Sequence, residues 1–168
     1  MRPKEKFKFL DLNYNFFPRP HFTSNKAFII EDQKNISEIK KIKIYVSLEN
    51  LISLKNIKIN EVEIQDANFN LNKKNYDFFI RILDNSFVDN NLNIKNSNIF
   101  FSTKENEVLL INKIVKMEYF YEPNELKNIV YSQNEIFNIP YSVEIFKNKK
   151  ERKYYYKFNF NFLKLQIE

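Results

Sequence analysis

Apolar and polar residues alternate along most of this chain, which is the pattern of β-strands that bury one face. The clearest example lies between Ile36 and Leu71, where alternating segments at 40–47 and 57–71 flank a short apolar stretch with helical spacing. The pattern predicts a mainly β fold. Further strands are predicted at 7–17, 27–30, 92–103, 108–121, 125–133, 136–147 and 152–167.

The alternation in the segment from Ile57 to Leu71 changes phase twice, at Asn60-Glu61 and at Gln65-Asp66. Side chains in a strand repeat every two residues, so each slip either moves the apolar set to the other face or marks a bulge that restores it. Bulges twist and bend a strand. We favour bulges and expect a long, curved strand here.

Two short segments change to helical spacing and predict short helices. The first follows Ser47, whose hydroxyl is a suitable N-cap, and the second spans 75–83 with Asn75 as its cap. The connections after residue 91 are short, which favours antiparallel neighbours, and 27–30 is interpreted as an edge strand. The predicted fold is an elongated, curved antiparallel sheet, a β-groove or meander, with two short helices in a single domain spanning 1–168.

Residue usage narrows the chemistry that this chain can carry. It has no glycine, which excludes Gly-rich phosphate loops and leaves Asn and Asp to adopt positive φ at turns. It has no cysteine, and its one histidine, His21, lies beside prolines in what we interpret as a surface turn. The acidic residues Glu61, Glu63 and Asp66 fall opposite the apolar set, as on a solvated face. We therefore expect a protein without catalytic residues, metal or cofactor.

The formal net charge of +6 raises the alternative of a basic β domain that binds nucleic acid or another polyanion. Lysines alternate with aromatics at 6–9 and 153–157, as on stacking platforms. The lysines are nevertheless spread over every predicted strand, and the chain contains only four arginines. We expect no nucleic acid partner, and a purely structural interaction module is a further alternative.

The last predicted strand carries a row of aromatic residues on one face, from Tyr154 to Phe162. Burial of each ring stabilises by roughly 1.5 to 3 kcal/mol relative to exposure, so this face is expected to be covered. The cover is either the opposite wall of a sandwich, an acyl chain or a neighbouring domain. No apolar segment is long enough for a membrane-spanning helix, and the N-terminus lacks the apolar region of a signal peptide.

Two segments resemble the AsmA family of Gram-negative envelope proteins. FFPRPHFTSNKAFII, at 16–30, is similar to that family's Pro-containing turn between its opening strands. IKKIKIYVSLENLISLKNIKINEVEIQDANFNL, at 39–71, is similar to its succession of strand, short helix and long strand. The helix that follows and the LNIKNSNIFF strand continue the order of elements of the family's N-terminal region, so the resemblance covers nearly the whole chain.

The resemblance implies a periplasmic β-groove with an apolar concave face, which shelters acyl chains during phospholipid transport or acts otherwise in outer-membrane biogenesis. Family members usually begin with an inner-membrane anchor, continue for several hundred residues and place Gly at several turns. None of these features is present, so we expect this chain to be part of a longer protein and do not carry the anchor over. The implied partners are a phospholipid or other acyl-chain lipid and envelope proteins. The candidate groove residues are Ile57, Ile59, Val62, Ile64, Phe69, Leu71, Phe158, Phe160 and Phe162.

Overall fold

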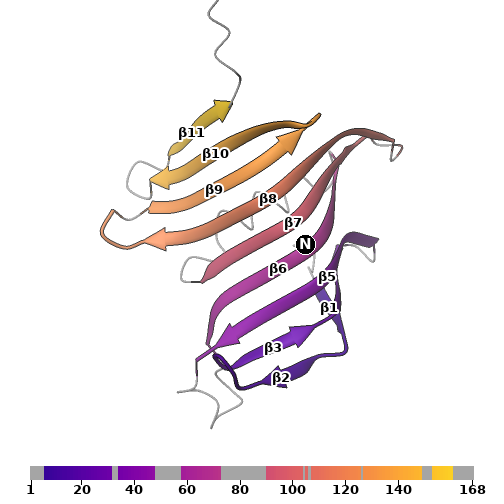
Figure 1. Cartoon of the computed structure of the whole chain (residues 1–168), viewed down its shortest axis with the longest axis vertical. Helices are drawn as coiled ribbons and strands as arrows, with labels where there is room; N and C mark the ends of the chain where they lie inside the picture. The colour runs from indigo at the N-terminus through magenta and orange to yellow at the C-terminus, as the bar shows by residue number, and fades with distance from the viewer. Residues whose placement is uncertain are drawn as a thin grey trace, which may run out of the picture.

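The computed structural model describes residues 6–31, 34–47, 58–72, 90–103, 105, 107–125, 127–148 and 153–160. The regular elements in these ranges are strands, and they form one large curved sheet of eleven strands that does not close (Figure 1). This confirms the prediction of a mainly β, curved sheet. The two predicted helices, at 48–52 and 75–83, lie outside the described residues.

Nine strands follow one another across the sheet in the order β1-β4-β5-β6-β7-β8-β9-β10-β11, and β3 joins the short β2 to β5. The bounds are β1 Lys6–Leu10, β2 Asn13–Asn15, β3 His21–Ser24, β4 Lys26–Glu31, β5 Lys34–Val46, β6 Ile59–Leu71, β7 Asn91–Ser102, β8 Val108–Glu122, β9 Lys127–Ile136, β10 Ile139–Asn148 and β11 Lys153–Phe160.

The sheet is antiparallel except between β6 and β7, which pair in parallel with Val62 opposite Leu92 and Phe69 opposite Ile99. The prediction of a wholly antiparallel sheet was therefore wrong at this pair. A parallel pair needs a crossover of a dozen or more residues, and the chain between Leu71 and Asn91 is long enough to supply one. The meander predicted after residue 91 is confirmed from β7 to β11.

The N-terminal strands differ most from the prediction. The expected single strand at 7–17 is broken at Asp11, which has a φ of 58°, and β2 turns away to pair with β3. The short β3 was not predicted at all. The segment at 27–30 belongs to β4, which pairs with β1 on one side and with β5 on the other, so the prediction of an edge strand was wrong.

The connection between β9 and β10 is a two-residue turn at Phe137 and Asn138, with φ of 50° and 63°. Positive φ at both positions is the geometry of a type I′ hairpin. The strand ranges predicted from the sequence, 125–133 and 136–147, place this turn too early, because Asn134 is buried and pairs with Tyr141 within the ladder. The described residues with positive φ are Asp and Asn at four of five positions, as the lack of glycine predicts.

Both phase slips in β6 keep its apolar side chains on one face. At the first slip, Tyr45 pairs with Glu61 and Val46 with Ile59, so Asn60 is the extra residue of a bulge. This confirms the bulge predicted at Asn60-Glu61. The second slip is made differently, because the register with β5 is unchanged and Asp66 instead takes a φ of 55°.

His21 is buried at the start of β3, so the interpretation of this residue as a surface turn residue was wrong. Its Nδ1 lies 2.6 Å from the carbonyl oxygen of Arg19, and its ring lies 5.2 Å from that of Tyr45. The Val46 amide donates to the Pro20 carbonyl oxygen at 3.1 Å, which holds the Pro-containing turn against the end of β5. The turn therefore buries a ring that its composition led us to place in solvent.

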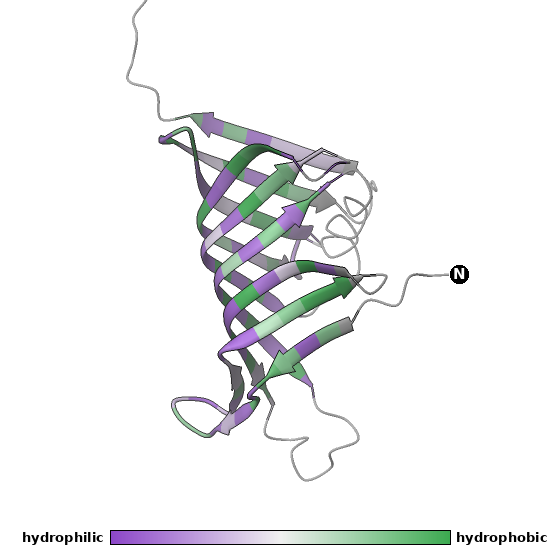
Figure 2. Cartoon of the chain, turned by 90° about the vertical axis from the view of Figure 1, so that its right-hand side faces the viewer, coloured by the Kyte–Doolittle hydropathy of each residue, from purple (hydrophilic) through white to green (hydrophobic). Residues whose placement is uncertain are grey.

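Hydropathy alternates along the strands, with hydrophilic and hydrophobic positions following one another in the side view (Figure 2). The buried apolar residues of β4 to β9 form one cluster, and its most enclosed members are Ala27, Ile39 and Ala67. We call the face that carries this cluster and the cavity described below the inner face. The opposite face is the outer face.

Candidate functional site: an apolar cavity on the inner face

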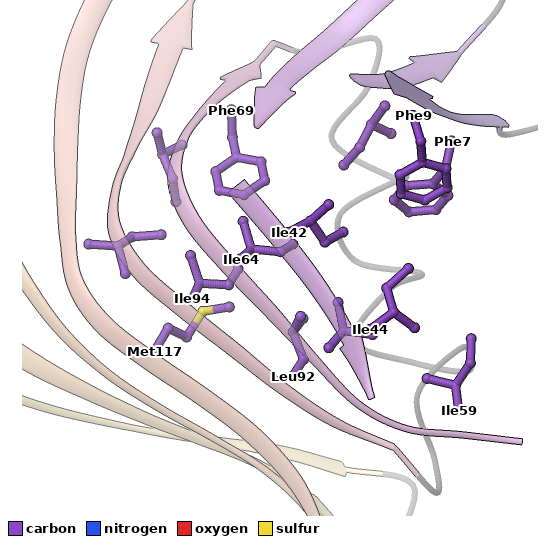
Figure 3. Close-up of a pocket in the computed structure, with 14 residues that line it drawn as sticks. Phe7, Phe9, Ile42, Ile44, Ile59, Ile64, Phe69, Leu92, Ile94 and Met117 are labelled. Carbon is purple, nitrogen blue, oxygen red and sulfur yellow. The ribbon is translucent and has the colours of Figure 1, made fainter. Parts of the chain in front are cut away.

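The inner face contains a cavity of about 460 Å³, which Figure 3 shows surrounded by aliphatic, aromatic and methionine side chains. It draws on β1, β4, β5, β6, β7 and β8. Volumes of this order are typical of ligand pockets in proteins. The lining residues are Phe7, Phe9, Ile29, Ile42, Ile44, Ile59, Val62, Ile64, Phe69, Leu92, Ile94, Ile99, Ile114 and Met117.

The cavity exists because the sheet curls. Neighbouring strands lie about 4.8 Å apart, so in a flat sheet β1 and β8, which are five places apart, would be separated by roughly 24 Å. Phe7 and Phe9 of β1 nevertheless line the same cavity as Met117 of β8. The rings of Phe7 and Phe9 are stacked, with centroids 6.3 Å apart. The curvature of the sheet thus makes its inner face concave, and β1 forms one edge of the cavity.

Inner-face side chains align across the strands in rows. The row that crosses the middle of the cavity, which we call the central row, pairs Ile44 with Val62 and Val62 with Leu92. Aligned apolar side chains contact one another across each ladder. The central row therefore makes one apolar band from β2 to β11. Its members are Tyr14, Phe22, Ile44, Val62, Leu92, Tyr119, Val130, Ile145 and Tyr156.

The structure brings together four of the nine candidate groove residues. Ile59, Val62, Ile64 and Phe69 all line the cavity. Leu71 is buried at the end of β6 but does not line it. Phe158 and Phe160 lie on the inner face of β11, outside the cavity and more than half exposed. Ile57 and Phe162 lie outside the described residues.

The sequence reasoning missed the lining residues of β1, β4, β5, β7 and β8. The alternation of Phe7 and Phe9 around Lys8, and of Ile42 and Ile44 around Lys43, was recognised as a strand pattern. That pattern identifies the apolar face of each strand. It does not identify which strands curl toward one another, and the β1–β8 approach has no signal in a local period.

A polar cluster of buried residues on β8 and β9 and the half-buried Tyr141 on β10 borders the cavity. Tyr141 donates to Asn112 Oδ1 at 2.8 Å, and Ser132 and Asn112 both donate to Asn134 Oδ1, at 2.9 Å and 3.4 Å. Burial raises the pKa of the Tyr141 hydroxyl, because the phenolate would lose its hydration. Asn134 pairs across the ladder with the cavity residue Ile114, so the apolar lining ends at these hydrogen-bonding groups.

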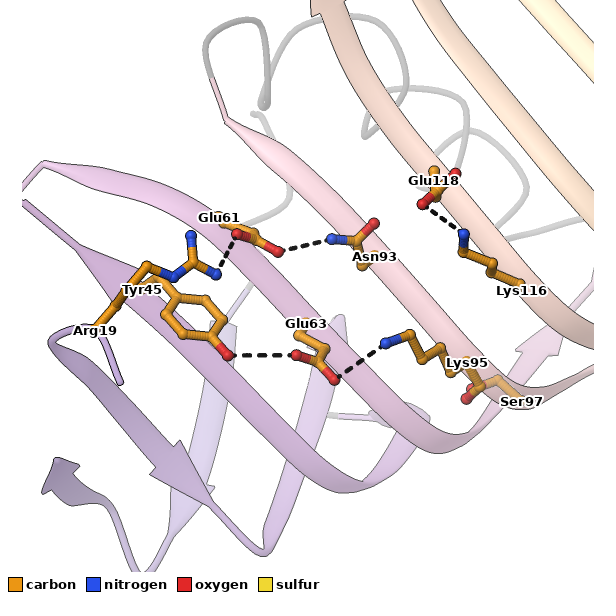
Figure 4. A network of polar contacts seen from close by, with 9 residues as sticks. All are labelled: Arg19, Tyr45, Glu61, Glu63, Asn93, Lys95, Ser97, Lys116 and Glu118. Atoms are coloured by element: carbon orange, nitrogen blue, oxygen red, sulfur yellow. Dashed lines mark hydrogen bonds and ion pairs between the residues drawn. The ribbon is translucent and has the colours of Figure 1, made fainter. Parts of the chain in front are cut away.

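The outer face of the same strands carries paired charges. Arg19 donates to Glu61 at 2.9 Å and lies over the Tyr45 ring, 4.1 Å from its centroid (Figure 4). The hydrogen bond to Glu61 holds the pKa of Arg19 above its ordinary value. Glu63 lies 3.6 Å from Lys95. Glu61 and Glu63 thus point away from the cavity, on the face opposite the apolar set, as the sequence predicts.

The described part of the chain supports neither a metal site nor a membrane-spanning helix. Within the described ranges, His, Asp and Glu side chains form no group of three or more that could hold a metal ion. None of the described residues belongs to a helix long and apolar enough to cross a membrane.

The chain was compared with known protein families and with curated proteins. No family model matches it, and no curated protein matches it.

Proposed function

We propose that this chain is a non-enzymatic lipid-handling domain that shelters acyl chains in the inner-face cavity. The observation that carries the proposal is the cavity itself, which is lined by hydrocarbon and thioether groups and lies on the concave face of an open sheet. Such a lining offers little hydrogen bonding to a polar ligand. Transfer of apolar surface from water into it is favourable, at about 25 cal/mol per Å².

The sheet that the described strands form does not close, and we propose that a chain-like ligand enters the cavity through this opening. The polar cluster of Asn112, Ser132, Asn134 and Tyr141 adds hydrogen-bonding groups beside the apolar lining. A phospholipid acyl chain with an ester group at its polar end suits this combination. Ester carbonyl groups accept hydrogen bonds, and the side-chain amides of Asn112 and Asn134 are donors.

The resemblance to the AsmA family supports a setting for this activity. We propose that the domain acts in the periplasm, in phospholipid transport or another step of outer-membrane biogenesis, as part of a longer protein. Fractionation of the native host with an antibody to the domain tests the location. Recovery with the cytoplasmic marker would contradict it.

Lipid retention is tested on the folded protein without detergent. The protein is incubated with vesicles of phosphatidylethanolamine and phosphatidylglycerol, re-isolated by gel filtration and examined by native mass spectrometry. We expect a mass increment of one phospholipid. A protein that never carries lipid under these conditions would overturn the proposal.

A pair of matched variants separates binding in the cavity from adsorption to the surface. Ile44→Trp adds bulk to a half-buried residue of the lining and should abolish retention. Ile111→Trp makes the same change at a half-exposed site on β8 that does not line the cavity, and it should retain lipid. Circular dichroism and urea unfolding of both variants report whether the sheet is intact. Equal retention by the two variants would place the lipid elsewhere.

A further inference from the structure

An exposed apolar segment connects β1 to β3 at one end of the sheet, where Figure 1 shows β2 and β3 side by side. It spans residues 12–18, with the sequence LNYNFFP, and we call it the tip. Its aromatic rings lie open to solvent, with Phe17 85% and Phe16 60% exposed. Leu12 and Tyr14 are exposed as well. Apolar side chains gathered on a surface commonly mark a site of interaction.

The tip is continuous with the cavity through the central row. Phe16 lies edge-on to Tyr14 with ring centroids 5.5 Å apart, and the Tyr14 ring lies 5.2 Å from that of Phe22 in β3. Phe22 pairs across the ladder with Ile44, which lines the cavity. Exposure falls along this path, from 60% at Phe16 and 40% at Tyr14 to 8% at Val62. An apolar path thus leads from solvent into the cavity.

The polar groups of the tip suit transfer into an apolar phase. No charged residue occurs between Asp11 and Arg19 in the sequence, so the tip itself carries no charge that would have to be desolvated. The Asn13 side chain donates to the Asp11 carbonyl oxygen and the Asn15 side chain to Thr23 Oγ1, both at 3.1 Å. Amides that are already hydrogen-bonded within the chain cost less to remove from water. The net charge of +6 attracts the whole chain toward anionic headgroups.

We propose that the tip docks on a phospholipid bilayer, with Phe16 and Phe17 inserted among the acyl chains, and that lipid passes from there along the central row into the cavity. Docking of this kind rests on the proposed function, because a lipid-handling domain takes its ligand from a membrane. Phe and Leu are typical of protein segments that lie at the boundary between headgroups and acyl chains. Docking places the outer end of the apolar path in contact with that boundary, so a lipid reaches the cavity without crossing water.

Insertion is tested with a single introduced tryptophan, because the chain contains none. On addition of vesicles of phosphatidylethanolamine and phosphatidylglycerol, the emission of Phe17→Trp should shift to shorter wavelength and be quenched by lipids brominated on the acyl chain. Phe137→Trp, at a ring 77% exposed in the β9–β10 turn, should show neither change. Equal responses of the two variants, or no response of Phe17→Trp, would overturn the proposal.

Flotation with the same vesicles measures docking without reference to the cavity. Phe17→Ser should lower the affinity for vesicles at least tenfold, and Phe137→Ser should leave it unchanged. Circular dichroism checks that both variants are folded. Wild-type binding should persist at high salt, because the tip is uncharged. Binding that high salt abolishes and that Phe17→Ser does not weaken would show adsorption through the lysines and would overturn the proposal.

Docking and lipid retention can be separated. Ile44→Trp, in the cavity lining, should abolish retention but leave flotation unchanged. Phe17→Ser should slow lipid uptake from vesicles at least tenfold, yet bind a short-chain phospholipid dissolved below its critical micelle concentration as the wild type does. Docking by a wild type that never retains lipid would contradict the lipid-handling proposal while supporting the insertion of the tip. Equal rates of uptake from vesicles by Phe17→Ser and the wild type would contradict the role of the tip while leaving the lipid-handling proposal intact.

Discussion

Asp66 and Asn96 lie side by side in the parallel strands β6 and β7, and both have positive φ, 55° and 48°. The register places them opposite each other, because Gln65 pairs with Lys95 and Asn68 with Asn98. At this point both strands exchange the parity of their inner-face residues: Ile64 and Ile94 precede it, and Phe69 and Ile99 follow it. The matched residues let two neighbouring strands change phase together, so that the cavity lining stays continuous.

The conformation of Asn96 should be sensitive to a β-branched side chain. Asn tolerates the left-handed region, whereas a β-branched residue there is a strong outlier. We expect Asn96→Val to lower the free energy of unfolding by about 1–3 kcal/mol. Asn96→Gly should change it by less than about 0.5 kcal/mol, because glycine populates positive φ freely. Urea unfolding followed by circular dichroism measures both.

Asn91→Val is the matched control for this prediction. Asn91 is an exposed residue in the same strand without positive φ. Because valine favours strands, the control should be neutral or slightly stabilising. Equal losses at positions 91 and 96 would show that the backbone conformation of Asn96 is not the cause.

Ser97 satisfies the backbone where the two strands change phase. Its buried hydroxyl accepts from the Ala67 amide at 3.0 Å and donates to the Lys95 carbonyl oxygen at 2.8 Å. Ser97→Ala leaves that amide buried without its acceptor, which should cost about 1–3 kcal/mol of unfolding free energy. Ser142→Ala, at a half-buried site in β10, should cost less than about 0.5 kcal/mol. Urea unfolding of the two variants side by side checks the difference.

The mainly β fold and the irregular positions of β6 were predictable because their causes are local. Alternation fixes the strand type, and the slips at Asn60-Glu61 and Gln65-Asp66 are visible in the sequence of one strand. The parallel pairing of β6 with β7 and the burial of His21 were not predictable. Both depend on contacts between segments distant in the chain, and a turn-like composition around His21 carries no information on what packs against it.

The candidate site was likewise predictable where it depends on one strand and not where it depends on how the sheet curves. Ile59, Val62, Ile64 and Phe69 were found because they share a face of one strand. Phe158 and Phe160 share the inner face of β11, and their strong aromatic pattern suggested a buried lining. Periodicity gives the face that a residue occupies but not its distance from the place where the sheet curls, which is why these two lie outside the cavity.

The half-buried Tyr141 hydroxyl predicts a loss of stability at alkaline pH. Burial raises its pKa in the folded chain above the ordinary value of 10.0, so the unfolded chain releases this proton first. The stabilising contribution should be complete below pH 10 and decrease as the pH rises through 10 toward the folded-state pKa. Urea unfolding at pH 9 and pH 11 should show a smaller loss for Tyr141→Phe than for the wild type.

Two considerations complete the Tyr141 experiment. Tyr141→Phe also removes the hydrogen bond to Asn112, so its stability at pH 9 should already be lower by about 1–3 kcal/mol. The informative quantity is therefore the change between the two pH values. Tyr14→Phe, at an exposed ring, should keep the wild-type change. An identical pH dependence in Tyr141→Phe and the wild type would contradict the prediction.

The ion pairs of the outer face predict weak binding to nucleic acid despite the net charge of +6. Arg19 and Lys95 lie 2.9 Å and 3.6 Å from the carboxylates of Glu61 and Glu63. We expect the dissociation constant for a single-stranded oligonucleotide at 150 mM salt to fall in the non-specific range of about 10⁻⁴–10⁻⁶ M. The double variant Glu61→Gln, Glu63→Gln removes both carboxylates and should tighten binding severalfold. Fluorescence anisotropy at several salt concentrations measures this, and nanomolar binding by the wild type would favour a polyanion-binding domain instead.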